Sequence, residues 1–324
     1  MAQDRRTGRP PGRAAGRGTA PRGRGRSASR VGCAALTSVA LLAGAVGGVV
    51  WFLDGRAPDA ASRRCTAGLD GTDWGLSVDQ ADNAALIAAM SLERGLPARA
   101  ATIALATALQ ESRLINIDYG DRDSVGLFQQ RPSQGWGTVE QIMDPVYSAG
   151  KFYDGLVAVP GYTELPVTEA AQAVQRSGFP DAYAQHEVRS RAWASALTGW
   201  STATLTCDLD APTVAGSVDL VAARVARDFA GTVPAAADAA RSSAEGTAVR
   251  LDSSALAVDG DTTRSAWAVA QWAVSVADEQ QVVAVEVGDA RWLRTEGADP
   301  ASAWQSGVLD EPVPEGSVVL VLAP

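Results

Sequence analysis

The stretch that decides the fold is "ATALQESRLINIDYGDRDSVGLFQQRPSQGWG", residues 106–137. It starts inside a helix built almost wholly of Ala, Leu, Ile and Thr, and that helix runs through Glu111 into a polar loop rich in glycine and aspartate. Helical spacing places Thr107 and Glu111 on one stripe, with Glu111 at the helix end. A carboxylate there costs free energy unless a partner or a function uses it.

The position of Glu111 predicts an unusual protonation state. The C-terminal end of a helix carries partial negative charge, and apolar neighbours disfavour ionisation, so we expect the pKa of this carboxyl to lie above its usual range. A carboxylic acid that keeps its proton at the wall of a cleft can cleave a glycosidic bond as a general acid. The alternative is a structural ion pair with Arg113 or Arg131, and the stretch alone leaves both open.

The loop after Glu111 contains residue types that suit a sugar ligand. Its glycines allow sharp bends and close approach of the backbone. Gln129 and Gln130 offer both donors and acceptors to hydroxyl and acetamide groups. Flat faces for sugar rings come from Tyr119, Phe128 and Trp136.

The N-terminal region differs sharply in composition from the rest of the chain. Residues 1–30 hold nine Arg and one Asp, a local charge of +8 in a chain of net charge −9, which leaves −17 for residues 31–324. These arginines lie among Gly, Pro, Ala and Ser, so we expect a disordered cytoplasmic tail. A nucleic-acid-binding arm is the other interpretation, but contact with anionic lipid explains the charge more simply, and no nucleic-acid partner is predicted.

Residues 31–53 contain no charged side chain and predict one transmembrane helix. The 23 residues would rise about 35 Å as a helix, enough to cross a hydrocarbon core of about 30 Å. Arginines before the span and Asp54 after it predict a cytoplasmic N-terminus and an extracytoplasmic main part. A cleaved signal peptide is the alternative, although no clean small-x-small site precedes Asp54.

The cysteines and the single histidine restrict the chemistry. Cys65 and Cys207 are the two cysteines outside the predicted span, and an oxidising exterior favours a disulfide between them. That bridge would close a loop of about 142 residues, worth ~5 kcal/mol in the chain-entropy model. One histidine, His186, makes a Cys/His zinc site implausible, and without a nucleophile-elbow motif it favours a surface or capping role. We predict no metal and no cofactor.

The order of elements predicts a mainly α domain over residues 65–207, after a linker at 54–64. Ser77 can cap the first helix, with Gln80 as its capping-box partner. Further helices are expected at 98–112, 138–157, 168–177 and 181–197. Helix and short β-branched strand patterns then alternate, which predicts a smaller α/β domain over residues 215–324.

The tryptophans of the C-terminal region leave two interpretations open. One is core packing, and the other is a glycan or partner site, because the pattern weakly resembles a small module of secreted actinobacterial cell-wall hydrolases. The residues concerned are Trp267, Trp272, Trp292 and Trp304.

Three ordered segments resemble the lysozyme-like superfamily, in particular soluble lytic transglycosylases and goose-type lysozymes. "QESRL" at 110–114 followed by "GLFQQRP" at 126–132 is similar to the family's Glu-Ser pair and Gly-Leu-Met-Gln motif. "IMDPVYSAGKFYDGL" at 142–156 is similar to its Asp-Pro-containing helix. "AAQAVQRSGFPDAYAQHEVRSRAW" at 170–193 resembles its Ala-Ala-Tyr-Asn-Ala-Gly segment and the helix after it. With the basic tail and the span, the chain resembles membrane-anchored actinobacterial forms.

The resemblance implies a role for each matched position. Glu111 would be the catalytic acid and then the base, Gln129 would line the sugar cleft, and Tyr183 would contact substrate near Glu111. The chain departs from the family at Gln175, where the family has Tyr, and at Arg176, where it has Asn. The substrate-binding residues that we predict are Ser112, Gln129, Gln130, Gln175 and Tyr183.

The aspartates of the loop bear on the mechanism. A lytic transglycosylase needs one carboxyl group, because the sugar's own 6-hydroxyl closes the ring. An inverting hydrolase needs a second carboxylate about 6.5–9.5 Å from the first. The candidates are Asp118, Asp121 and Asp123, and the alternative for each is a turn-forming residue.

These observations predict a membrane-anchored glycosidase that cleaves the β-1,4 bond between N-acetylmuramic acid and N-acetylglucosamine in peptidoglycan. Its partners would be glycan strands, the membrane through one helix, and other cell-envelope proteins. The rival hypothesis is a catalytically weak glycan-binding or scaffold protein of the cell envelope.

Overall fold

The computed structural model describes residues 63–256, 260–294 and 303–324, which fall in one compact unit, Ala61–Pro324. The predicted tail (1–30), the predicted span (31–53) and all but the last residues of the predicted linker (54–64) lie outside the described residues. Within the described ranges, no helix is long and apolar enough to cross a membrane.

The predicted fold class, a mainly α domain followed by a smaller α/β domain, is wrong. The described residues form eight α-helices and two antiparallel sheets, with 41% helix and about 19% strand. The helices are α2 (Val78–Glu93), α3 (Ala98–Ser112), α4 (Val139–Met143), α5 (Pro145–Val157), α6 (Val167–Gln175), α7 (Glu187–Leu197), α8 (Val218–Asp228) and α9 (Thr262–Ser275). The strands are β1 (Arg64–Leu69), β2 (Thr72–Ser77), β3 (Leu205–Asp208), β4 (Ala235–Ala237), β5 (Thr247–Asp252), β6 (Val282–Val287), β7 (Ala290–Leu293), β8 (Trp304–Ser306) and β9 (Ser317–Leu322).

A three-stranded sheet of order β2-β1-β3 frames the block that the sequence predicted to be helical. Strands β1 and β2 form a hairpin in which Leu69 faces Thr72 across the two-residue turn Asp70-Gly71. Both turn residues have positive φ, 53° and 74°, which is the type I′ geometry that matches strand twist. Asp-Gly is a strong hairpin signal, and overlooking it contributed to the error in fold class.

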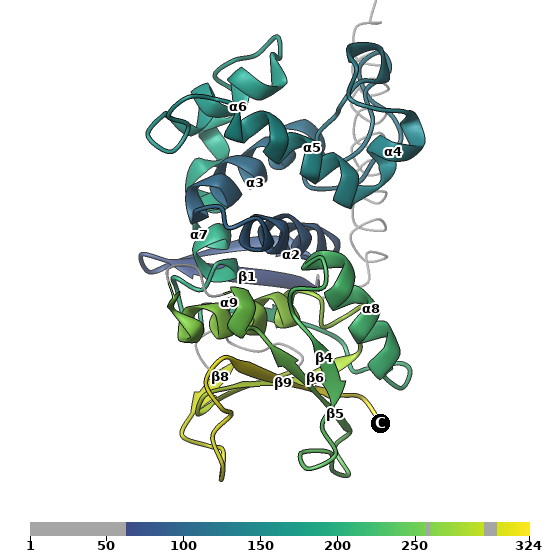
Figure 1. Cartoon of the computed structure of the whole chain (residues 1–324), viewed down its shortest axis with the longest axis vertical. Coiled ribbons are helices and arrows are strands. Elements are labelled where there is room, and N and C mark those ends of the chain that lie inside the picture. Colours follow the sequence, from purple (N-terminus) through teal and green to yellow (C-terminus); the bar gives the residue numbers. More distant parts are fainter. Residues whose placement is uncertain (1–62, 257–259, 295–302) are drawn as a thin grey trace, which may run out of the picture. The chain divides into compact units, whose positions relative to one another are not determined.

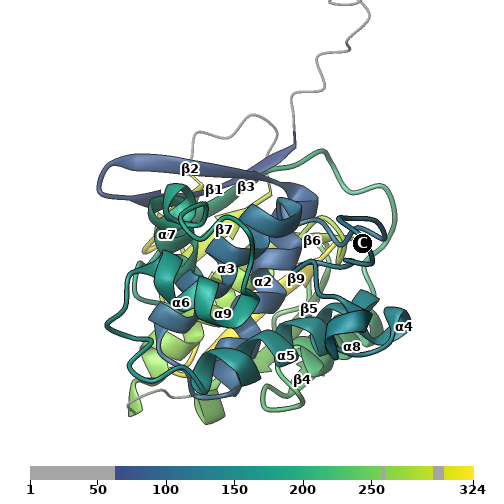
Figure 2. The same cartoon turned by 90° about the horizontal axis from the view of Figure 1, so that it is seen from above.

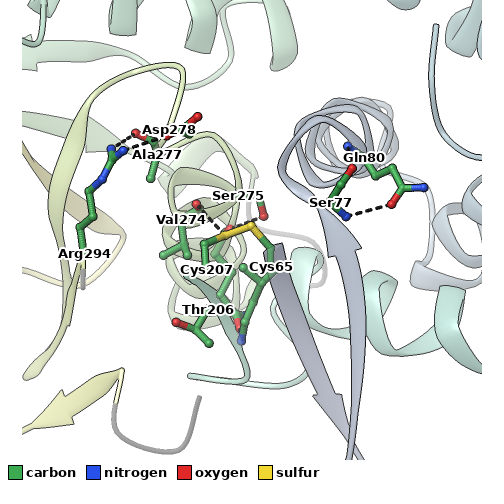
Figure 3. The surroundings of a disulfide bond; sticks show 12 residues. Cys65, Ser77, Gln80, Thr206, Cys207, Val274, Ser275, Ala277, Asp278 and Arg294 are labelled. Atoms are coloured by element: carbon green, nitrogen blue, oxygen red, sulfur yellow. Dashed lines mark hydrogen bonds and ion pairs between the residues drawn. A yellow bond between two sulfur atoms is a disulfide. The ribbon is translucent and has the colours of Figure 1, made fainter. Parts of the chain in front are cut away.

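The predicted disulfide between Cys65 and Cys207 is confirmed. Strand β3 pairs with β1 in the register that places Cys65 opposite Cys207, so the sheet aligns the two thiols. Figure 3 shows the bridge beside α9, with the sulfur of Cys207 3.4 Å from the carbonyl oxygen of Val274. The bridge therefore joins the two ends of the helical block at the surface of a helix from the C-terminal region.

The second sheet has six strands in the order β4-β5-β9-β6-β7-β8, and every neighbouring pair is antiparallel. An α/β domain would need parallel strands joined by crossover helices, which explains why this part of the prediction fails. Helix α9 contacts both β6 and β9 on one side and α2 on the other. Figure 1 shows this layering, with α9 between α2 and the six-stranded sheet, and Figure 2 shows the small sheet along one edge.

The hydrophobic core is continuous across the predicted boundary between the two domains. Buried residues of α2 and α3 belong to the same cluster as Trp272 on α9 and Trp292 on β7. Both tryptophans are almost wholly buried, which supports core packing for them. The division at residues 207 and 215 stays a prediction, because one core spans it.

Helix α3 carries Glu111 and is buried on nearly all sides, as its composition predicts. The helix ends after Ser112, where Arg113 and Leu114 adopt left-handed conformations with φ of 58° and 59°. The amide of Leu114 donates to the carbonyl of Ala108, which closes the helix end. This turn leaves Glu111 in the last helical turn, beside the loop.

Candidate functional site

A cleft of about 620 Å³ opens beside Glu111. Its walls come from the end of α3, the loop between α3 and α4, and the turn that follows α6. The loop contributes both Gln129 and Gln130, and the turn contributes residues 175–179. Segments that are far apart in the sequence, among them the quoted stretch and the segment around Gln175, therefore meet at one cavity.

Glu111 has no arginine partner in the described part of the chain. The hydroxyl of Tyr183 donates to its Oε1 at 2.6 Å. Arg131 pairs with Asp123 instead, and Arg113 is exposed, so the structural ion pair considered from the sequence does not form. Burial raises the pKa of Glu111, and hydrogen bonds from Tyr183 and Gln175 offset part of that effect. The carboxyl is thus poised to hold a proton beside an open cavity.

Tyr183 is a buried donor to this carboxyl. Its side chain is fully buried, and burial together with the nearby charge of Glu111 raises the pKa of the phenol. A neutral phenol can only donate to an ionised carboxylate, so Tyr183 fixes the position of Glu111 and favours its charged form. The structure thus brings Tyr183 close to Glu111, as predicted, although the two residues are 72 positions apart in the sequence.

Gln175 connects the turn after α6 to the loop. Its Nε2 donates to the carbonyl oxygen of Phe128 at 2.7 Å, and its side chain also reaches Glu111. The amide therefore occupies the place between acid and loop and lines the cleft. The side-chain amide of Gln175 is a neutral group that offers both a donor and an acceptor there.

Gln129 lines the cleft but folds back onto its own loop. Its backbone is left-handed, with φ of 47°, and its Nε2 donates to the carbonyls of Tyr119 at 3.2 Å and Gly126 at 3.3 Å. The side chain passes so close to Gly120 that a Cβ there would lie 1.8 Å from Oε1 of Gln129. A Cβ at Gly120 would also lie 2.7 Å from the backbone oxygen of Ser124, so the loop requires glycine there, and Gln129 stabilises the loop.

The other two predicted substrate contacts differ in kind. Ser112 is buried and donates to the carbonyl oxygens of Leu127 at 2.7 Å and Ala108 at 3.1 Å, so it anchors the loop to α3. Gln130 is 1% exposed and donates to the carbonyl oxygen of Ser148 at 3.0 Å. Its Oε1 is a buried acceptor without a protein partner, at the wall of the cleft.

The three candidate aspartates occupy different environments. Asp123 accepts from Arg131 Nε at 2.8 Å, from Ser133 N at 2.8 Å and from Ser133 Oγ at 3.0 Å, and these contacts hold its pKa well below its usual range. Asp121 lines the cleft, whereas Asp118 is exposed and is not among the lining residues. Of the three, Asp121 is the one at the cavity wall.

His186 contacts α3 rather than an acid or a nucleophile. Its Nε2 lies 3.1 Å from Oε1 of Gln110, and burial together with Arg189 lowers its pKa. No group of three or more His, Cys, Asp or Glu side chains in the described ranges is placed to hold a metal ion.

No family model matches this chain, and no curated protein matches it. The assignment of chemistry therefore rests on the residues themselves.

Sequence reasoning left several residues of the cleft lining unassigned, among them two arginines and a phenylalanine. Arg122 and Arg176 line it, and so does Phe179, whose side chain is 77% exposed. The departure of Arg176 from the family pattern was a readable signal, since a cation had replaced a neutral amide. Phe179 gave no signal of its own, because nothing local distinguishes a cleft aromatic from one in an ordinary turn.

Proposed function

We propose that this protein is a glycosidase of the cell envelope that cleaves the β-1,4 bond between N-acetylmuramic acid and N-acetylglucosamine in peptidoglycan. The observation that carries the proposal is Glu111, a carboxyl with a raised pKa, no cationic partner and a cavity beside it. A general acid needs this combination, because it must hold a proton at neutral pH and reach the substrate.

Glu111 would protonate the glycosidic oxygen as the bond to the anomeric carbon breaks. The resulting oxocarbenium-like centre then takes an oxygen nucleophile. The proton that this nucleophile releases passes to the Glu111 carboxylate in a transglycosylase, and to a second carboxylate in an inverting hydrolase. Tyr183 would hold the carboxyl in place through both steps and stabilise the charged form between them.

The nucleophile separates two versions of this function. In a transglycosylase it is the 6-hydroxyl of the muramic acid residue, and Glu111 suffices. In an inverting hydrolase it is a water activated by a second carboxylate. Asp121 is the aspartate available for that role, because it lines the cleft while Asp123 is held by Arg131 and Ser133.

The proposed location follows from the sequence beyond the described residues. We propose that residues 31–53 anchor the chain in the membrane, with the Arg-rich tail in the cytoplasm and residues 63–324 facing the wall. The glycan strand would then be reached from the membrane side, and other envelope proteins are further candidate partners.

The test is digestion of purified peptidoglycan by the full chain, with the released muropeptides identified by mass. Anhydro ends indicate a transglycosylase, and reducing ends indicate a hydrolase. We expect Glu111→Gln to lower the rate about 10³-fold, within the range for loss of a general acid. Glu164→Gln is the matched control, because Glu164 is exposed and lies outside the cleft lining.

The same experiment tests the rival scaffold function. No release by the wild-type chain, together with unchanged glycan binding by Glu111→Gln, would assign the cleft to binding and reject catalysis.

A further inference from the structure

A second hollow of similar size lies next to the cleft beside Glu111. The second hollow has a volume of about 620 Å³ and shares part of its wall with the first. The shared residues come from the loop before α4 and from the end of α6: Gln134, Trp136, Gln175 and Arg176. The two hollows therefore lie next to each other along this shared wall, and together they are called the groove below.

Arg176 is the unpaired cation of this groove. Arg131 pairs with Asp123 at 2.8 Å, and Arg122 lies 3.9 Å from Asp121. Arg176 has no carboxylate within 4 Å in the described part of the chain, and the second hollow has no acidic residue in its lining. Arg176 is exposed at the wall shared by the two hollows, so its guanidinium is free to attract an anionic group of a ligand.

The backbone at Arg176 is held in a costly conformation. Arg176 ends α6 with a φ of 52°, and its amide donates to the carbonyl of Gln172 at 2.9 Å. A non-glycine residue in this region costs roughly 1–2 kcal/mol, and glycine is the common choice at such a helix end. Strain of this kind is concentrated at functional sites.

Left-handed residues are in fact clustered around this groove. The described ranges contain nine non-glycine residues with positive φ. Three of the nine line the cleft, namely Arg122, Gln129 and Arg176, and two more, Arg113 and Leu114, end helix α3 shortly after Glu111. An arginine kept at a strained position, where glycine would relieve the strain, indicates that its side chain is used.

We propose that Arg176 binds the carboxylate of a lactyl group on the glycan, so that the groove selects strands whose muramic acid residues carry no peptide stem. This inference rests on the proposed function. The lactyl group is attached to the sugar ring itself, and a carboxylate there enters the groove together with the ring. When a peptide stem is present, the same carbonyl is a neutral amide and cannot form a charge-assisted bond with a guanidinium.

Trp136 and Gln175 complete the recognition. Trp136 lies in the wall shared by both hollows and would offer a flat face to the sugar ring. Gln175 lies in the same wall, next to Arg176 in the sequence, and its side chain reaches Glu111. A muramic acid residue seated there would have its carboxylate near Arg176 and its glycosidic oxygen on the side of Glu111. Specificity would then come from the end of α6, and the chemistry from Glu111 at the end of α3.

The test compares three glycans with the full chain: intact peptidoglycan strands, amidase-treated strands without stems, and chito-oligosaccharides, which have no lactyl group. Both binding affinity and kcat/KM are measured. We expect stem-free strands to be preferred about tenfold to a hundredfold, the scale of one charge-assisted hydrogen-bonded pair. Arg176→Gln should abolish this preference, and Arg176→Lys should keep part of it, since Lys retains the charge but loses the bidentate geometry.

Arg191→Gln is the matched control, because Arg191 is an exposed arginine on α7 whose partner, Asp70 at 3.6 Å, lies outside the groove. A preference that persists in Arg176→Gln overturns the inference, and so does a wild-type chain that treats the three glycans alike. A preference for intact strands that Arg176→Gln removes would assign the carboxylate to the stem peptide and overturn the lactyl assignment. If no glycan is cleaved but stem-free strands bind through Arg176, the proposed catalysis fails and the inference stands.

Discussion

Glu111 and Asp228 are both shielded from water, Glu111 in part and Asp228 almost completely, but their hydrogen-bond partners differ in charge. Asp228 is 1% exposed and accepts from Arg224 Nε at 2.8 Å, Arg227 Nε at 2.8 Å and Trp272 Nε1 at 2.9 Å. Glu111 accepts from the neutral Tyr183, has no cation beside it and faces a cavity. The fully buried Asp228 and the partly buried Glu111 therefore have different uses, and their partners distinguish them.

The Asp228 site joins elements from both sides of the predicted domain boundary. Arg224 on α8 also binds Asp82 on α2, at 2.7 Å, and Glu279 after α9. The Arg224 side chain is 4% exposed, so its guanidinium is largely shielded from water, whereas Glu279 is exposed. Burial raises the pKa of Asp82 against the attraction of Arg224. Charges that are paired in this way hold three helices together, and Asp228 itself has cations and a donor on both of its oxygens.

The largest effect that tests the difference between these two acids is expected on stability, at Arg224. Arg224→Ala leaves Asp228 and Asp82 without their main cation and should lower the free energy of unfolding by about 3–5 kcal/mol. The matched control is Arg227→Ala, since the Arg227 side chain is 44% exposed and its removal should cost less than about 1 kcal/mol. Urea denaturation at pH 7 measures both, and equal losses in the two variants would contradict a structural role for the buried cation.

The helices could largely be predicted from local sequence, and the sheets could not. Ser77 and Gln80 form the predicted capping box, and the expected helix at 98–112 is α3. Both depend on residues within one or two turns of each other. The six-stranded sheet depends on pairings such as β5 with β9, about seventy residues apart, which no local pattern specifies.

The candidate site shows the same difference between features set by nearby residues and features set by distant ones. Glu111 was predictable because a charge at the end of an apolar helix is visible in the sequence, and Tyr183 required the family resemblance. The different roles of Ser112 and Gln129 were not predictable, because their hydrogen bonds depend on how the loop folds back. Arg131 could have paired with Glu111 or with Asp123, and the loop geometry decides for Asp123.

A smaller effect, which sharpens the role of Glu111, is expected at Tyr183. The Tyr183 hydroxyl favours the ionised carboxylate, so Tyr183→Phe raises the pKa of Glu111 further. Because the acid works in its protonated form, activity is lost as pH rises through that pKa, and the alkaline limb of the pH–rate profile should move to higher pH. At its optimum the variant should lose about tenfold in kcat/KM, the scale of one hydrogen bond.

Tyr162→Phe is the control for this change, since Tyr162 is partly buried outside the cleft lining. An alkaline limb that moves to lower pH in Tyr183→Phe, or one that also moves in Tyr162→Phe, would show that Tyr183 does not set the protonation of Glu111.

Glu111 should also reduce stability, in contrast to Asp228. Its pKa is higher in the folded state than in the unfolded chain, so folding favours the proton, and stability falls as pH rises from the usual glutamate range through the raised pKa. Gln cannot ionise, so Glu111→Gln should be more stable than the wild type at pH 7, by less than about 1 kcal/mol, the scale of one hydrogen bond. The difference should vanish near pH 3, where both chains are neutral at this position; a gain that grows toward low pH would reverse the assigned shift.

The smallest effect is expected at Asp123, which resembles Asp228 more than Glu111. Arg131 and the backbone and hydroxyl of Ser133 occupy both of its oxygens, and its depressed pKa makes it a poor base. Asp123→Asn should therefore change the rate of peptidoglycan cleavage by less than about threefold, under 1 kcal/mol in the barrier. Asp121→Asn, measured beside it, should lower the rate strongly if the products carry reducing ends, because a hydrolase needs the carboxylate at the cavity wall. A large loss at Asp123 with none at Asp121 would mean that an ion-paired aspartate supplies the second carboxylate, and partners would then no longer distinguish structural acids from reactive ones.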